Sequence, residues 1–410
     1  MSGRRLPIAP VAEPAKRRRL PLADAARPVD EACTPLYAVW EITLACDLAC
    51  RHCGSRAGKP RPDELTTAEA LDLVAQMTDL GVKEVTLIGG EAYLRADWLD
   101  IVRAFAARGV LVNVTTGGRG FTLERARAAR DAGVEGISVS VDGLRATHDR
   151  LRAVSGSFDG AMSALAHGRA VGLRLSANTQ INQWNRHELG DLLELLLAQG
   201  ITGWQPQLTA AMGRAADEDA LLLEPWHLVD LFPELARLKA RCDEADVLFW
   251  PGNSLGYYGP YEEQLRAAFP AGHRGACGAG IKTMGIEANG DVKGCPSLPT
   301  EAYVGANVRD ASLRDIWRRS HRLRFTRDQT VADLSGFCAT CYYANECRAG
   351  CNFTAHVLLG KIGDNPFCHH RALMLKEEGL RERVVRVAPA PGTPFDHGRF
   401  EIVREPWSVS

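Results

Sequence analysis

The chain lacks any uninterrupted apolar run long enough to cross a membrane. Its most leucine-rich stretch, Leu189–Leu197, is broken by Asp191 and Glu194, whereas a membrane-spanning helix needs about 20 consecutive apolar residues. The N-terminal region also lacks the charged, apolar and small-residue segments of a secretion signal. We therefore predict a protein that does not span a bilayer and that works in the cytoplasm.

The chain also lacks an excess of charge of either sign. It contains 49 lysine and arginine residues against 50 aspartate and glutamate residues, which gives a formal net charge of −1. Proteins that hold nucleic acid or an anionic membrane by their overall field usually carry a clear positive excess. We expect neither of these as a partner.

The spacing of the cysteines argues against a secreted disulfide scaffold. Seven of the twelve cysteines lie in tight C-x2-C, C-x3-C and C-x5-C clusters, which are typical of metal thiolates in a reducing compartment. The 410 residues, 46% of them hydrophobic, suffice for one large domain with an appendage or for two domains.

Residues 1–35 have the composition of a segment that cannot form a core. They hold six prolines, few large apolar side chains and the basic run Lys16–Arg19. We predict a disordered basic, proline-rich arm. A solvated tail is the more common role for such a terminus, and a recruitment arm for an acidic peptide is the alternative.

From residue 36 to about residue 245, short β-branched runs alternate with longer amphipathic ones. This alternation is typical of βα units around a parallel sheet. After the first run, Thr66 and Glu69 form a capping box, and Gly81 supplies the stop for the helix between them. Six such units predict an α/β fold with a partial (β/α)6 TIM barrel. The expected strands are Leu36–Thr43, Glu84–Ile88, Leu111–Thr115, Gly136–Val141, Arg174–Thr179 and Thr202–Leu208.

Polar residues and glycines gather at the ends of the expected strands. Because barrels keep their active sites at the C-terminal ends of the strands, we expect these residues to converge on one face. They are Cys46, Cys50 and Cys53 after the first strand, Gly89–Glu91 after the second, Thr115–Gly118 at the third, Ser140, Asp142 and Gly143 at the fourth, Asn178 and Gln180 at the fifth, and Gln205 and Gln207 in the sixth.

The C-x3-C-x2-C cluster of Cys46, Cys50 and Cys53 offers three thiolates to one metal centre and leaves one coordination position open. Such a site suits a metal that does chemistry, since a structural site is usually closed by a fourth ligand. A 4Fe-4S cluster held in this way would keep one iron free for a small chelator that carries an amine and a carboxylate. A fragment of a zinc site is the alternative on spacing alone.

Other residues at the strand ends could hold such a chelator. Gly89 and Gly90 let the backbone approach a ligand closely, and Glu91 gives an anion for an ammonium group. Arg152, with Ser140, could take the matching carboxylate. Together with the cysteines they predict a pocket for the amino-acid end of S-adenosylmethionine, although a lone Gly-Gly-Glu also occurs in ordinary turns.

This combination resembles the radical S-adenosylmethionine superfamily, whose signature is a cysteine triad in the loop after the first strand. In that family the reduced cluster cleaves S-adenosylmethionine to methionine and a 5′-deoxyadenosyl radical, which abstracts a hydrogen from an unactivated C–H bond. By resemblance, Cys46, Cys50 and Cys53 ligate that cluster.

The stretch Ser140–Arg152 is similar to the peptide-modifying branch of the superfamily, in which the serine and the last arginine contact the carboxylate of the cofactor. One departure is visible, because Ala92 stands where proline usually follows the Gly-Gly-Glu triplet. The contact with the cofactor needs only the glycines and the carboxylate, so we expect it to persist.

A second set of seven cysteines occupies residues 277–368 and exceeds what one tetrahedral metal needs. The run Ile281–Gly294 predicts a hairpin with its turn at Asn289-Gly290, which would bring Cys277 and Cys295 together. Zinc ribbons use similar cysteine pairs, so two zinc sites are the alternative.

The layout of these cysteines resembles the SPASM domain, an extension of many radical S-adenosylmethionine enzymes that mature peptides and proteins. The resemblance implies two auxiliary 4Fe-4S clusters, and therefore three 4Fe-4S clusters in the chain. The implied ligands are Cys277, Cys295 and Cys351 for the first auxiliary cluster, and Cys338, Cys341, Cys347 and Cys368 for the second. The first lacks an obvious fourth thiolate, so His273, the distant Cys242, a water or the substrate closes it.

We therefore predict a radical S-adenosylmethionine enzyme that oxidatively modifies a side chain of a peptide or protein, with a ribosomal precursor peptide as substrate. Auxiliary clusters near the substrate suit an oxidation because they can accept an electron. Flavodoxin or ferredoxin is the expected reductant. A small metabolite as the substrate, and a non-enzymatic zinc or iron–sulfur protein, are the alternatives.

The expected domain organisation follows from these segments. The arm of residues 1–35 precedes the barrel of residues 36–245, and a connecting segment of residues 246–276 leads to the SPASM domain of residues 277–370. A C-terminal helix and tail fill residues 371–410. Within the connecting segment, the stretch Asn253–Pro260 either lines a substrate cleft or forms a plain interdomain loop.

Overall fold

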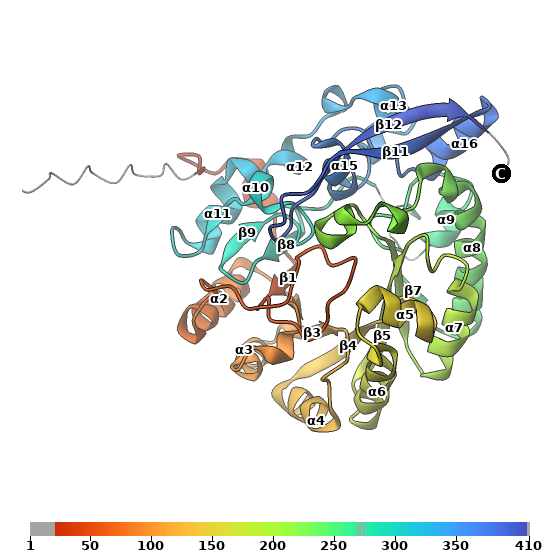
Figure 1. The fold of residues 1–410 in the computed structure, drawn as a ribbon. Coiled ribbons are helices and arrows are strands. Elements are labelled where there is room, and N and C mark those ends of the chain that lie inside the picture. The colour runs from red at the N-terminus through yellow and green to blue at the C-terminus, as the bar shows by residue number, and fades with distance from the viewer. Residues whose placement is uncertain (1–20, 268, 270–271, 274, 408–410) are drawn as a thin grey trace, which may run out of the picture.

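The computed structural model describes residues 21–267, 269, 272–273 and 275–407, and a ten-stranded sheet runs through them (Figure 1). The strand order is β10-β9-β8-β1-β2-β3-β4-β5-β6-β7. The strands are β1 (Tyr37–Glu41), β2 (Glu84–Ile88), β3 (Leu111–Thr116), β4 (Val134–Ser140), β5 (Arg174–Ile181), β6 (Gly203–Leu208), β7 (Leu248–Phe249), β8 (Thr283–Ile286), β9 (Asp291–Lys293) and β10 (Ala306–Asn307). In the part of the chain that the structure describes, no helix is both long and apolar enough to cross a membrane.

Strands β1 to β7 pair in parallel, and helices cover the outer side of the curved sheet (Figure 1). All six predicted strands are present, and the predicted α/β class with a parallel sheet is confirmed. The sheet is open, with β7 and β10 at its two edges. The helices of this part are α2 (Thr67–Leu80), α3 (Trp98–Ala106), α4 (Leu123–Ala132), α5 (Arg145–Arg152), α6 (Ser157–Ala170), α7 (Leu189–Ala198) and α8 (Leu228–Glu244).

Local sequence signals define α2 as predicted. The Thr66 hydroxyl accepts a hydrogen bond from the Glu69 N–H, and the Glu69 carboxylate accepts one from the Thr66 N–H at 2.8 Å. Gly81 ends the helix with φ of +109°, a left-handed conformation that glycine adopts without strain. The buried face of α2 includes Leu73 and Met77, both fully buried.

The cysteine-rich module continues the barrel sheet, which the sequence did not predict. Strand β8 pairs in parallel with β1, and β9 folds back antiparallel on β8. The predicted hairpin is confirmed, with Gly290 at φ of +89° in its turn. Most of the module is built from short helices: α9 (Glu262–Leu265) precedes it, and α10 (Thr300–Tyr303), α11 (Leu313–Arg319), α12 (Phe325–Asp328), α13 (Gly336–Ala339), α14 (Ala344–Cys347) and α15 (Asn352–Leu359) lie within it.

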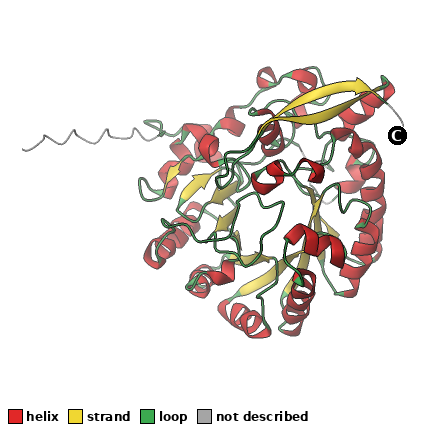
Figure 2. Ribbon diagram, viewed as in Figure 1, coloured by secondary structure: helices red, strands yellow, loops and turns green. Residues whose placement is uncertain are grey.

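The C-terminal segment differs from the predicted helix and tail. A helix is present as α16 (His369–Glu377), but β11 (Leu380–Ala388) and β12 (Arg399–Pro406) follow it as a long antiparallel hairpin. Figure 2 shows this hairpin as the pair of long strands across the C-terminal module. The alternation of charged and apolar residues in these runs is the period-two pattern of a strand, and the prediction overlooked it.

The segment predicted to be a disordered arm is folded over its described part, residues 21–35. Helix α1 (Pro28–Ala32) carries Asp30, which is fully buried. Asp30 is paired with Arg27 at 2.9 Å, with Arg324 at 2.7 Å and with Arg327 at 3.2 Å. Three guanidinium groups offset the cost of burying the carboxylate, and composition does not reveal such distant partners. The basic run Lys16–Arg19 lies outside the described residues.

We expect Asp30→Ala to destabilise the protein by about 3 kcal/mol or more, because it leaves buried arginines without their counter-charge. Burial alone would raise the pKa of Asp30, but the hydrogen bonds from Arg27 and Arg327 hold it well below the usual range. Chemical denaturation followed by circular dichroism measures the change. Asp328→Ala is the matched control, since Asp328 pairs with Arg27 at an exposed position and should cost about 1 kcal/mol at most. Equal losses in both variants would contradict the assignment.

Candidate functional site

The loop after β1 carries the three cysteines predicted to hold a metal centre. Cys50 is buried, and Cys46 and Cys53 are partly exposed. Burial raises the pKa of Cys46 to about 12, and the charges of Glu91, Cys50 and Cys53 contribute in the same direction. The three sulfur atoms therefore share one small region. A cationic metal centre would favour their thiolate forms, which are the ligating forms.

Gly89 and Gly90 pack directly against the cysteine loop. The Gly90 N–H donates to the Thr43 carbonyl at 2.8 Å, and the Glu91 N–H donates to the Ala45 carbonyl at 2.8 Å. A Cβ at Gly90 would lie 2.2 Å from the Ala45 oxygen, and one at Gly89 would lie 2.4 Å from the Thr43 oxygen. The sequence predicted glycines that admit a ligand. The structure adds a second requirement, since any side chain there would displace the loop.

The Glu91 carboxylate is buried and held by two donors from the end of β3. The Thr116 hydroxyl donates to Oε2 at 2.5 Å, and the Gly117 N–H donates to Oε1 at 2.6 Å. Burial raises the pKa of Glu91 to about 7, although both hydrogen bonds oppose this rise. A fixed carboxylate beside the cysteine loop can pair with an ammonium group, and that role remains a prediction.

Arg152, at the end of α5, joins the cysteine loop to a buried carboxylate. Its Nη2 lies 2.5 Å from Asp142 Oδ2, and its Nη1 donates to the Cys50 sulfur at 3.5 Å. His52 Nε2 lies 3.0 Å from the same Asp142 oxygen. Burial would raise the pKa of Asp142, but the charges of Arg152 and His52 hold it below the usual range. A carboxylate ligand would therefore have to share Arg152 with Asp142.

Ser140 is the last residue of β4 and lies opposite Asn178 of β5. Both residues stand near the C-terminal ends of their strands, at the edge of the sheet that also carries Glu91 and Asp142. The structure thus brings the predicted residues Ser140 and Arg152 to one side of the barrel. Contact of Ser140 with a cofactor carboxylate remains a prediction.

A cavity of about 350 Å³ lies between the strand ends and the C-terminal module. We call it the junction cavity. Its barrel side includes Gly89 and the predicted glutamines Gln180, Gln205 and Gln207. Its other side includes Cys277, Cys295 and Cys351, the three residues assigned by resemblance to the first auxiliary cluster. The two cysteine-bearing parts of the chain therefore face one space.

A second cavity of about 320 Å³ lies between the β11–β12 hairpin and the segment that follows β6. We call it the hairpin cavity. Leu208 and Ala210 line both cavities and so form part of the wall between them. Thr209 and Thr354 line the hairpin cavity with buried hydroxyls that have no hydrogen-bond partner among the described residues. Such hydroxyls can serve a bound water or ligand.

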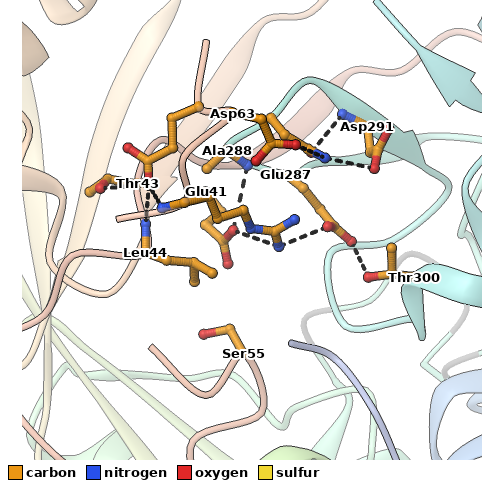
Figure 3. Close-up of polar contacts among 12 residues, drawn as sticks. Glu41, Thr43, Leu44, Ser55, Asp63, Glu287, Ala288, Asp291 and Thr300 are labelled. Carbon is orange, nitrogen blue, oxygen red and sulfur yellow. Dashed lines mark hydrogen bonds and ion pairs between the residues drawn. The ribbon is translucent and has the colours of Figure 1, made fainter. Parts of the chain in front are cut away.

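A cluster of four charged side chains, Glu41, Arg61, Glu287 and Lys293, lies where β1 meets the β8–β9 hairpin, and Glu41 lines the junction cavity. Arg61 Nη2 lies 2.9 Å from Glu287 Oε2 and 3.4 Å from Glu41 Oε1, and Lys293 Nζ lies 2.7 Å from Glu287 Oε1. Figure 3 shows the Glu41 and Glu287 side chains pointing toward each other, with Ser55 on the other side of an open space from Glu41. Glu41 and Ser55 line the cavity.

Cys277, Cys295 and Cys351 form the first cysteine group of the module. Burial raises the pKa of Cys295 to about 12, and the charges of Cys277 and Cys351 add to it. The predicted meeting of Cys277 and Cys295 is thereby confirmed. Neither of the two side chains named as possible fourth ligands lines the cavity with them. Cys242 is buried in α8, and His273 shares a hydrogen bond of 3.1 Å with the Tyr258 hydroxyl.

The second group holds the remaining four cysteines of the module. Burial raises the pKa of Cys347, and so do the charges of Cys368, Cys338 and Cys341. All four line a small cavity of about 20 Å³. The segment Asn253–Pro260 lies beside both cysteine groups. Its first two residues line the junction cavity, and its two tyrosines line this small cavity.

The arrangement of the thiols bears on the zinc alternative. Within residues 21–407, apart from the undescribed positions, no three His, Cys, Asp or Glu side chains are close enough to hold one metal ion. Zinc gathers thiolate sulfurs at about 2.3 Å around a single point, whereas a 4Fe-4S cluster spreads its thiolates over a larger body. The two kinds of metal site therefore require different spacings of the sulfur atoms.

The sequence did not reveal the ion pairs that several charged residues of the site form. Asp142 holds Arg152 and also pairs with His52, while Glu41 lines the junction cavity and shares Arg61 with Glu287. Signals for two of them were present, because Asp142 follows an apolar strand and Glu41 ends one. A charged residue at such a position indicates a buried partner. The partner itself comes from distant sequence, which one chain does not reveal.

Comparison with known proteins agrees with this geometry. The family model of the Radical SAM superfamily matches residues 40–196, and that of an iron–sulfur cluster-binding domain, SPASM, matches residues 277–342. The mycofactocin maturase MftC of Mycobacterium tuberculosis is 30% identical over 386 residues, which are 91% of this chain and 90% of the maturase. The predicted resemblance is confirmed.

Two further proteins mark the range of similar molecules. The AdoMet-dependent heme synthase of Nitratidesulfovibrio vulgaris is 28% identical over 355 residues, 81% of this chain and 91% of the synthase. The crystal structure of Streptococcus suis SuiB bound to the precursor peptide SuiA matches with a TM-score of 0.62 and 17% identity, covering 78% of this chain and 72% of SuiB. That likeness shows a shared fold.

We expect Gly90→Ala to displace the cysteine loop, because the added methyl would meet the Ala45 carbonyl and the Cys46 Cβ. The variant should bind about four fewer irons per chain than the wild type after anaerobic reconstitution, which equals one cluster. Iron and sulfide analysis measures the loss. Gly58→Ala is the matched control, since Gly58 hydrogen-bonds the same loop but a Cβ there meets nothing within 4 Å. An unchanged iron content in Gly90→Ala would refute the expectation.

Proposed function

The chain belongs to the radical S-adenosylmethionine superfamily, and we propose that it oxidatively modifies a side chain of a ribosomally made precursor peptide. It is an enzyme with a SPASM domain, which implies S-adenosylmethionine, a 4Fe-4S cluster and auxiliary clusters. The observation that carries the proposal is the junction cavity. Its lining joins the strand ends of the barrel to three cysteines of the module.

We assign the S-adenosylmethionine site to residues of the barrel that do not themselves line the junction cavity. Cys46, Cys50 and Cys53 would hold the cluster, and the cluster with its cofactor would supply a radical that abstracts hydrogen from a C–H bond. Glu91 would bind the ammonium group of the cofactor. Arg152 at the end of α5, with Ser140 at the end of β4, would bind its carboxylate. Asp142 holds the Arg152 guanidinium in place for this task.

The auxiliary sites support an oxidative reaction. We assign one 4Fe-4S cluster to Cys277, Cys295 and Cys351 and a second to the four remaining cysteines of the module, which makes three clusters in all. The first set lines the junction cavity itself, so an electron acceptor there would stand close to the substrate. An oxidation needs such an acceptor, whereas a redox-neutral rearrangement does not.

The relatives and the second cavity support a peptide substrate. MftC is similar over 91% of this chain, and SuiB was solved with a precursor peptide. The hairpin cavity adjoins the junction cavity along Leu208 and Ala210 and offers room for residues that flank a modified one. Flavodoxin or ferredoxin would deliver the electron that starts each turnover, in a reducing compartment such as the cytoplasm.

A small metabolite is the second candidate substrate. It is supported by the similarity to the heme synthase of Nitratidesulfovibrio vulgaris over 81% of this chain. The two candidates share the cluster sites and differ in what fills the junction cavity. A peptide would extend beyond that cavity, and a metabolite would be enclosed by it.

We expect anaerobically reconstituted protein to contain about twelve irons per chain, four for each of three clusters. It should form 5′-deoxyadenosine from S-adenosylmethionine when a reductant is supplied. The triple variant Cys46→Ala/Cys50→Ala/Cys53→Ala should lose about four irons and all cofactor cleavage. Cys33→Ala is the control, since Cys33 is buried outside the three groups and should leave both unchanged. Full cofactor cleavage by the triple variant would contradict the cluster assignment.

The substrate class is tested by co-expression with short peptides encoded next to the gene. We expect one of them to change mass in a manner that depends on Cys46, Cys50 and Cys53. Loss of two mass units indicates a crosslink, a thioether or another oxidation that removes two hydrogens. If no neighbouring peptide changes mass while cofactor cleavage is intact, the small-metabolite candidate takes precedence.

A further inference from the structure

Glu41 is the only carboxylic acid among the described residues that line the junction cavity. It ends β1, just before the cysteine loop, and its side chain is 3% exposed. The same cavity is lined by Cys277, Cys295 and Cys351 on its opposite side. A substrate in this cavity would therefore be within the space that Glu41 borders.

Glu41 and Glu287 share the same cations but are held differently. Both Glu287 oxygens have short contacts: Oε2 with Arg61 at 2.9 Å, and Oε1 with Lys293 at 2.7 Å and the Thr300 hydroxyl at 2.5 Å. Glu41 Oε1 has only two long contacts, both of 3.4 Å, with Arg61 and the Ala288 N–H. Glu41 Oε2 has no hydrogen-bond partner among the described residues. Each oxygen of the Glu287 carboxylate therefore accepts at least one short hydrogen bond, whereas Oε2 of Glu41 has an open position for a proton.

The surroundings of Glu41 and Glu287 shift the pKa values of their carboxyl groups in opposite directions. Burial raises the pKa of Glu41 to about 8, with Glu287 adding to the rise and Arg61 and Lys293 opposing it. Burial also acts on Glu287, but Lys293 and Arg61 hold the pKa of Glu287 below its usual value. Phe395 covers the two cations, with Lys293 Nζ 3.9 Å from its ring centre. Two acids in one site with separated pKa values indicate different roles.

We propose that Glu41 is the catalytic base that takes the proton released when the substrate radical is oxidised. The inference rests on the proposed function. For a carbon radical next to an N–H, O–H or S–H group, that bond to hydrogen breaks and a double bond forms between carbon and the heteroatom. One electron leaves to an acceptor of the iron–sulfur class, and the proton goes to Oε2 of Glu41. Atoms and charge balance in this step.

The sign of the pH dependence follows from the base role. A protonated carboxyl cannot accept a proton, so the competent fraction falls as pH drops below the pKa of about 8. Product formed per 5′-deoxyadenosine should therefore rise with pH and level off above about pH 8. Removing the charge of Glu287 lowers the pKa of Glu41 and should move this rise to lower pH.

The test compares Glu41→Gln, Glu41→Asp and the matched control Glu287→Gln with the wild-type holoenzyme. The substrate is the one identified by the mass-change experiment. Glu41→Gln should form 5′-deoxyadenosine within about three-fold of the wild type and still transfer deuterium from labelled substrate into it. Its product per 5′-deoxyadenosine should fall by about 100-fold. Glu41→Asp should recover part of that loss, because it restores a carboxylate.

The Glu287→Gln variant shows whether Glu41 acts as a base or only as a structural charge of the cluster. Glu287 does not line the cavity, so its loss should keep the high-pH plateau and shift only the midpoint of the pH profile downward. Circular dichroism and iron content verify that each variant is folded and loaded. If Glu41→Gln keeps the wild-type product ratio, or if both variants lose product equally with no shift in midpoint, the assignment of Glu41 is wrong.

A second measurement needs no substrate. Infrared difference spectra of the reconstituted enzyme should show a protonated carboxyl band that disappears as pH rises through about 8 and is absent in Glu41→Gln. A spectrum without any band that depends on Glu41 between pH 6 and pH 10 would overturn the proposal. If the wild-type enzyme forms no 5′-deoxyadenosine, that result counts against the proposed function. The Glu41 carboxyl band can still be observed in that case, so the two failures are distinguishable.

Discussion

The parallel pairing of β8 with β1 is the contact on which the rest of the site depends. Its register sets Tyr37 opposite Thr283 and Trp40 opposite Ile286. The backbone therefore fixes where Glu41 meets Glu287, and where Cys295 stands relative to the cysteine loop. Backbone hydrogen bonds make this contact, and they permit a single register. The two walls of the junction cavity, one from the barrel and one from the module, therefore have a fixed position relative to each other.

The barrel could be predicted from the sequence, and its joining to the module could not. Strand β2 has the predicted bounds, because its alternation of buried and partly exposed residues is a local pattern. Strands β7 and β10 contain two residues each and have no pattern to read. The pairing of β1 with β8 joins distant segments, and local periodicity carries no information about such a partner.

The site divides in the same way. Cysteine spacing predicts the first cysteine loop and the meeting of Cys277 with Cys295 across a hairpin, whereas the grouping of Cys351 and Cys368 with the others follows from the family resemblance. Asp30, Asp142 and Glu41 are charged residues whose burial is explained only by arginines and histidines from other elements. The strand ends mark Glu41 and Asp142 as candidates, but the sequence does not identify the partners of any of the three. The long-range ion pairs that permit their burial become visible only with the fold.

The late arrival of β8 also sets an order of events during synthesis. One edge of β1 has no partner until the ribosome has made residues 283–286, so the nascent barrel displays an open strand edge throughout translation of residues 42–282. Open edges recruit other chains. Until then the junction cavity has its barrel wall alone, because the wall that carries Cys277, Cys295 and Cys351 is made last.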